Sequence, residues 1–106
     1  MAPSGGMIST IRQAVQKLED VTAVYGMGSY FRGEPFNDVD IVVVVRRTPA
    51  LVVLGTAIRA ALLPLSEIVG SRIDITIFTE SEFAGEPLRD MATLVPIYVA
   101  SQRSSS

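Results

Sequence analysis

The sequence predicts a single α+β domain in which helices cover at least one face of a β-sheet. The chain has 106 residues, of which 48% are hydrophobic and 19% are charged, so it can form one modest core. Runs rich in β-branched residues occupy 21–25, 39–46 and 73–78. Stretches with helical spacing of apolar residues lie around and between these runs. The predicted order is therefore helix, strand, loop, strand, helix, strand, helix.

The first predicted helix covers about 9–19, because apolar side chains recur there every three or four residues. Thr10 and Gln13 offer a capping box near its start. The first strand follows at 21–25. A short helical turn is expected at 29–32, before a loop at 33–37 that contains a proline and an asparagine.

The second strand is predicted at 39–46, and its residues 41–45 are all apolar. Such a run is typical of an interior strand that is covered on both faces. The next helix is expected from Ala50 to about Leu63, because Pro49 fits a first turn and Pro64 fits a stop.

Residues 65–70 are expected to be a connector with some extended structure, and the third strand is predicted at 73–78. Residues 79–82 resemble a helix start. A last helix is predicted at 87–100, with a kink at Pro96 because proline removes one backbone hydrogen bond. We expect a flexible leader at 1–6, a single domain at 7–100 and a flexible tail at 101–106.

Composition excludes several functions. The net charge is −2 and the basic residues, eight Arg and one Lys, are scattered, which argues against strong nucleic-acid binding. The chain has no Cys or His, so it lacks disulfides, zinc–thiolate sites and an imidazole base. We expect no membrane span, because no run reaches the roughly 18 apolar residues required. The start has no secretory signal, so a cytoplasmic location is expected.

Two carboxylates separated by one residue follow a glycine–serine turn. Asp38 and Asp40 alternate with Val39 in an extended chain, so they point to the same side. Their mutual repulsion is costly unless a cation lies between them. Mg²⁺ suits this position because it takes oxygen ligands and bridges to phosphates. The backbone N–H groups of Gly28 and Ser29 and the Ser29 hydroxyl suit phosphate oxygens.

Ordinary structural roles are an alternative for each of these residues. Asp38 and Asp40 are also compatible with loop-end acids, and Ser29 with a helix cap. Arg32 is compatible with a solvated surface arginine. Asp74, the one acid within the third strand, is compatible with an exposed face of that strand.

In combination, these residues resemble the nucleotidyltransferase superfamily that includes DNA polymerase beta, and most closely its minimal members. The matching features are the apolar strand from 21, Gly28-Ser29, Asp38-Val39-Asp40 and a third acid, Asp74, on a later strand. The resemblance implies a small mixed sheet with the polymerase beta palm-like fold. It also implies that Asp38, Asp40 and Asp74 converge at one rim of that sheet.

The resemblance implies transfer of a nucleoside monophosphate, AMP above all, from an NTP to a hydroxyl on a protein or another acceptor. Asp38, Asp40 and Asp74 are then the catalytic and metal-binding residues, holding two Mg²⁺ ions for which Mn²⁺ can substitute. Gly28, Ser29 and Arg32 are then nucleotide-binding residues. The loop before Asp38 is shorter than in many minimal members, and it ends in Asn37 rather than Ser or Thr.

The resemblance also implies a partner, because one small domain has no evident second half to bind an acceptor. That partner is a HEPN-type toxin, which this chain modifies as an antitoxin, or a second copy of the chain. Two other functions stay open. One is a non-catalytic binding module on the same fold, and the other is transfer to a small molecule such as an aminoglycoside.

Overall fold

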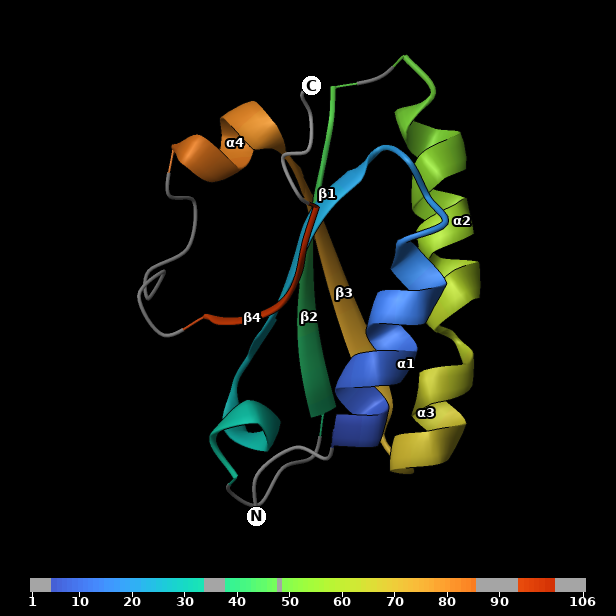
Figure 1. Cartoon of the computed structure of the whole chain (residues 1–106), viewed down its shortest axis with the longest axis vertical. Coiled ribbons are helices and arrows are strands. Elements are labelled where there is room, and N and C mark those ends of the chain that lie inside the picture. Colours follow the sequence, from blue (N-terminus) through green and yellow to red (C-terminus); the bar gives the residue numbers. More distant parts are fainter. Residues whose placement is uncertain (1–4, 34–37, 48, 86–93, 101–106) are drawn as a thin grey trace.

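The computed structural model describes residues 5–33, 38–47, 49–85 and 94–100 (Figure 1). The described elements are, in chain order, α1 (Gly5–Val15), β1 (Val21–Met27), the 3-10 helix η1 (Ser29–Arg32), β2 (Asp38–Val45), α2 (Leu51–Leu62), α3 (Pro64–Val69), β3 (Arg72–Thr79), α4 (Glu80–Ala84) and β4 (Val95–Val99). The four described strands form one sheet in the order β3-β2-β1-β4.

The sheet is mixed. β1 pairs antiparallel with both β2 and β4, whereas β2 pairs parallel with β3. A parallel pair needs a crossover connection, and here α2 and α3 supply it. The predicted α+β fold class, a small mixed sheet with helices, is confirmed.

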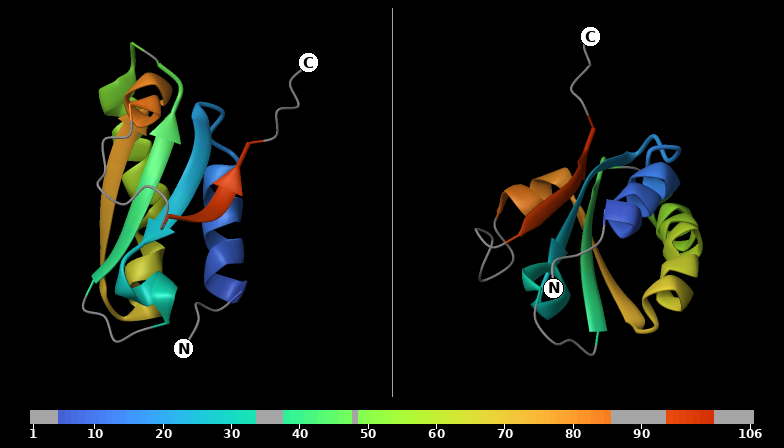
Figure 2. Two further views of the ribbon diagram at one scale, coloured as in Figure 1. Left: turned by 90° about the vertical axis from the view of Figure 1, so that its left-hand side faces the viewer. Right: turned by 60° about the horizontal axis from the view of Figure 1, so that its bottom comes forward.

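The two faces of the sheet are covered differently. α1, α2 and α3 lie on one face, and α4 lies on the other (Figures 1 and 2). Between the three helices and the sheet lies the core, which includes Ile11, Val15, Val24, Val39, Ile41, Val43, Val45, Ile58, Leu62 and Leu65. Val42 and Val44 are buried on the opposite face of β2. The second predicted strand is therefore an interior strand covered on both faces, as expected.

The predicted connector at 65–70 is wrong, because α3 occupies Pro64–Val69. Pro64 follows α2 but also occupies the first turn of α3, where its missing N–H costs no hydrogen bond. Leu65 is buried against the sheet and so anchors the short helix. Gly70 ends α3 in the left-handed region, at φ 77°.

The last predicted helix is also wrong within the described residues, because β4 occupies Val95–Val99. β4 completes the side of β1 that β2 leaves open, and Ile97 is buried. Pro96 is tolerated because it lies on an outer strand, opposite Tyr25 where the register shifts. The earlier part of that predicted helix, 87–93, lies outside the described residues.

Several boundaries differ by a few residues from those predicted. α1 begins at Gly5 and ends at Val15, earlier at both ends than expected. η1 and α4 appear where helical turns were predicted, and Thr79 and Glu82 form a capping box on α4. Of the predicted leader at 1–6, residues 5 and 6 form the start of α1 and 1–4 lie outside the described residues. The predicted loop at 33–37, apart from Gly33, and the predicted tail at 101–106 also lie outside them.

One stretch of the described residues comes within the range of a membrane-spanning helix by length and composition alone. Leu51–Ile68 spans 18 residues with a mean hydropathy of 1.7, enough by length and composition to cross a membrane. Core helices of soluble proteins pass the same test. Here the stretch is divided into α2 and α3, and its side chains Ile58, Leu62 and Leu65 are packed against the sheet.

Candidate functional site

Three acids lie at one end of the sheet, on the face away from α1, α2 and α3. Asp38 and Asp40 flank Val39, which is fully buried on the helix side. In the parallel register of β2 and β3, Asp40 is opposite Asp74. Residues opposite each other in a sheet point to the same face, so Asp74 shares the face of Asp38 and Asp40. The tertiary structure thus brings the three predicted acids to one end of one face.

Gly28 turns the chain from β1 into η1 directly beside Asp40. Its φ is 89°, a left-handed value that glycine adopts without strain. A Cβ added at this position would lie 2.9 Å from Asp40 Oδ2, closer than ordinary van der Waals contact. The carbonyl of Gly28 accepts a hydrogen bond from the Phe31 N–H at 3.2 Å, which begins η1. The bare backbone of Gly28 therefore borders the Asp40 carboxylate.

The other predicted nucleotide-binding residues are placed only through their backbone. Ser29 and Arg32 are the first and last residues of η1, next to Gly28 in the chain. Their side chains lie outside the described part of the structure. Phe31 from the same turn is buried in the core and packs beside Gly26. This packing fixes η1 against the end of the sheet.

The carboxylates affect each other electrostatically. The pKa of Asp40 is raised from its usual value, mainly because partial burial disfavours the charged form. The charges of Asp74 and Asp38 raise this pKa further, and the charge of Arg72 lowers it. The site therefore favours added positive charge near Asp40.

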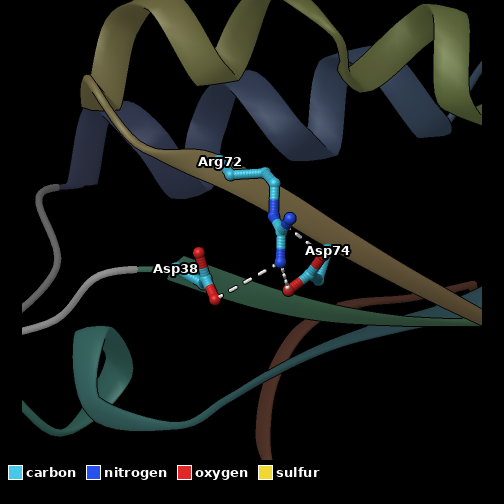
Figure 3. A network of polar contacts seen from close by, with 3 residues as sticks. All are labelled: Asp38, Arg72 and Asp74. Atoms are coloured by element: carbon cyan, nitrogen blue, oxygen red, sulfur yellow. Dashed lines mark hydrogen bonds and ion pairs between the residues drawn. The ribbon is translucent and has the colours of Figure 1, made fainter.

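Arg72 supplies some of that positive charge (Figure 3). Its Nη2 lies 3.6 Å from Asp38 Oδ2, and its Nε lies 3.4 Å from Asp74 Oδ1. Arg72 is not among the site residues predicted from the sequence. The available signal was its spacing, because a residue two before Asp74 in a strand points to the same face. Its position opposite Asp38 depends on the register of β2 and β3, which no local pattern fixes.

The donor chemistry fits a hard divalent cation. Asp38, Asp40 and Asp74 offer carboxylate oxygens, which Mg²⁺ and Mn²⁺ prefer, and the chain contains no Cys or His. Across the described residues, no three acidic side chains are gathered tightly enough to form a metal-ligand group as they stand. Arg72 contacts two of the three acids instead.

An open cavity of about 730 Å³ adjoins this site along the outer edge of β3. Arg72 and Asp74 line one end of it, and Leu62, Leu63 and Ser66 line the helix side. A second cavity of about 520 Å³ continues along β3 and α2, and Arg59 and Ile75 line both. The site therefore opens onto a groove that is large enough for part of a second molecule.

Most of this chain matches a known protein family. The profile of the nucleotidyltransferase domain matches residues 8–96, which include Gly28 and all three acids. The chain belongs to the nucleotidyltransferase domain family. Membership implies an NTP substrate, and nucleotidyltransferases generally use divalent metal ions.

A solved structure supports the fold. The chain is similar to the crystal structure of a provisionally assigned nucleotidyltransferase from Sulfolobus solfataricus, with a TM-score of 0.53 and 19% sequence identity. The likeness covers 90% of this chain and 82% of the other. No curated protein matches this nucleotidyltransferase at a significant level.

Proposed function

We propose that this nucleotidyltransferase transfers AMP from ATP to a hydroxyl group on a protein, in a reaction that requires Mg²⁺ and releases pyrophosphate. The observation that carries the proposal is the placement of Asp40 opposite Asp74, with Gly28 bordering the Asp40 carboxylate. Neighbouring carboxylates beside a bare glycine turn suit a metal-bound triphosphate.

Each site residue has a separate role in this proposal. Asp38 and Asp40 would hold both Mg²⁺ ions, and Asp74 would complete the site on the acceptor side. Bound Mg²⁺ supplies charge stabilisation to the attacking and leaving oxygens. The acceptor oxygen bonds to the α-phosphorus of ATP, the bond to pyrophosphate breaks, and Asp74 takes the hydroxyl proton. The Gly28-Ser29 backbone and Arg32 contact the departing phosphates.

The acceptor is proposed to be a protein partner, specifically a HEPN-type toxin that this chain inactivates. Five large apolar side chains along α2 and α3 are exposed: Leu51, Val52, Val53, Leu63 and Ile68. We call these the α2–α3 apolar surface. Leu51, Val52 and Leu63 also line the groove beside β3, which leads to Asp74. Exposed apolar side chains of this size are characteristic of protein interfaces.

The deciding experiment compares the parent with Asp74→Asn. Both proteins are incubated with ATP, Mg²⁺ and the product of the adjacent gene, and intact-mass spectrometry measures a nucleotide increment on that partner. We expect an increment with the parent and a loss of rate by orders of magnitude with Asp74→Asn. Affinity for Mg²⁺–ATP should change much less, because Asp74 acts mainly in the transition state.

A non-catalytic binding module is the alternative that the α2–α3 apolar surface favours. In that case the parent adds no nucleotide to any copurifying partner. Neutralisation of the partner is then unchanged by Asp74→Asn. An increment on an aminoglycoside, with none on the protein, would instead indicate a small-molecule acceptor.

A further inference from the structure

Arg72 connects the two strands that carry the acids. It is the first residue of β3, and it contacts Asp38 on β2 as well as Asp74 on its own strand. Its Nη2 also donates a hydrogen bond to Asp74 Oδ2 at 3.5 Å. One guanidinium thus neutralises carboxylates from both strands at the end of the sheet where β2 and β3 begin.

These carboxylates are also those that we assign to the divalent cation. A guanidinium and a metal ion on the same pair of carboxylates repel each other, so each weakens the binding of the other. The side chain of Arg72 is 72% exposed, which lets it leave without opening the core. It also lines the cavity of about 730 Å³ beside β3, so it has space into which to move.

We propose that Arg72 is a positioning residue that competes with the divalent cation for Asp38 and Asp74. This inference rests on the proposed function, because that function assigns the cation to these acids. Without the cation, Arg72 holds the acids of β2 and β3 together against their mutual repulsion. Cation binding displaces the guanidinium, so part of the binding free energy is spent on breaking its ion pairs.

The first test measures Mn²⁺ affinity by calorimetry without nucleotide. The proteins are the parent, Arg72→Gln, which keeps most of the side-chain length, and Arg47→Gln as a charge-matched control. Arg47 is exposed and lies beyond the opposite end of β2. Two exposed ion pairs are lost on cation binding to the parent, so we expect Arg72→Gln to bind Mn²⁺ roughly three- to tenfold more tightly. Arg47→Gln should bind like the parent.

The second test is thermal unfolding of the same proteins in EDTA and in Mn²⁺. In EDTA, Arg72→Gln should unfold at a lower temperature than the parent, because its acids repel without compensation. Added Mn²⁺ should raise its melting temperature by more than it raises that of the parent.

Equal or weaker Mn²⁺ binding by Arg72→Gln would overturn the competition while leaving the metal site in place. A similar gain in Arg47→Gln would also overturn it, by attributing the effect to net charge. Absence of Mn²⁺ binding in all three proteins would overturn the competition, whereas the proposed function, in which the metal binds with the triphosphate, is tested separately by nucleotide transfer. Competition with no nucleotide transfer by the parent would leave the role of Arg72 standing and reject the proposed function.

Discussion

Gly28 matters both for its backbone conformation and for its position beside Asp40. Its positive φ demands glycine for conformational reasons, and its distance to Asp40 demands glycine for space. Gly70 has only the first of these two requirements, because its φ is 77° but nothing lies within 4 Å of an added Cβ. The pair therefore offers a matched comparison within one chain.

We expect Gly28→Ala to affect the site and Gly70→Ala to affect stability alone. Each substitution should cost about 1–2 kcal/mol of unfolding free energy, because a Cβ is strained in the left-handed region. Only Gly28→Ala forces the Asp40 carboxylate to move, so only it should weaken Mg²⁺–ATP binding, by roughly tenfold. Chemical denaturation and calorimetry measure the two effects. Equal nucleotide affinity in both variants would limit Gly28 to a structural turn.

Asp40 should destabilise the domain in the absence of metal. Its folded-state pKa is raised by burial and by Asp74 and Asp38, so its protonation favours folding. This stabilisation is complete below the pKa of the unfolded chain and is lost as the pH rises through the raised folded pKa. At pH 7 in EDTA, Asp40→Asn should therefore melt roughly 2–4 °C above the parent, a modest gain because the group is partly solvated.

The difference between Asp40→Asn and the parent should shrink as the pH falls through the raised pKa of Asp40, because the parent then takes up its proton. Mg²⁺–ATP should stabilise the parent and not the variant. Scanning calorimetry at several pH values follows both trends. A variant that melts below the parent in EDTA at pH 7 would contradict the raised pKa.

The two edge strands of the sheet, β3 and β4, differ in what lies beside them. On β4, the carbonyl of Ile97 accepts a hydrogen bond from Arg12 Nε of α1 at 2.7 Å. This contact satisfies an edge carbonyl and ties the helix layer to the strand. β3, on the other side, has no further strand beside it among the described elements, and the groove follows its outer edge.

Arg12→Met should destabilise the domain through β4. The partly buried Ile97 carbonyl loses its donor, which should cost about 1–3 kcal/mol, while the Met side chain keeps the apolar contacts of the Arg stem. Hydrogen exchange should show faster exchange for β4 amides than for β2 amides. Gln13→Met, at the exposed neighbouring position of α1, is the control and should change stability by less than about 0.5 kcal/mol. Unchanged β4 exchange in Arg12→Met would show that the strand is held by its pairing with β1 alone.

At the scale of the whole molecule, the apolar stretch Leu51–Ile68 contributes side chains to both the core and the surface. Ile58, Leu62 and Leu65 of α2 and α3 are buried against the sheet, whereas Val52, with 85% of its surface exposed, contributes to the α2–α3 apolar surface. The high hydropathy of Leu51–Ile68 therefore combines a core face with an exposed apolar face.

A substitution at a buried position of this stretch should reduce stability, whereas one at an exposed position should reduce partner binding. Ile58→Ala should cost about 2–5 kcal/mol of stability, because it removes buried methylenes and leaves a cavity. Val52→Glu should change stability by less than about 0.5 kcal/mol, yet it should abolish copurification of the protein partner. Thermal unfolding and affinity capture with the adjacent gene product measure the two effects. Intact partner binding in Val52→Glu would exclude the α2–α3 apolar surface as the interface.

Local patterns in the sequence predicted those elements whose residues indicate their structure without reference to the rest of the chain. The apolar run of β2 predicted a strand buried on both faces, and alternation placed Asp38 and Asp40 on one side of it. The same patterns failed for α3 and β4. The local sequence around Leu65 is compatible with a connector or a helix, and only its burial against the sheet favours the helix. Residues 95–99 form a strand because they pair with the free edge of β1.

The sequence by itself therefore determined which residue types the chain offers for chemistry and the order in which they occur. The tertiary structure decided which of them meet. Asp74 lies opposite Asp40, and Arg72 opposite Asp38, only because β2 and β3 pair in one particular parallel register. That register is set by the burial of Val39 and Ile41 under α2 and α3, and a shift of one residue would turn the acids of β2 to the face opposite that of Asp74. Such long-range pairing is a property of the packed core, which no window of neighbouring residues contains.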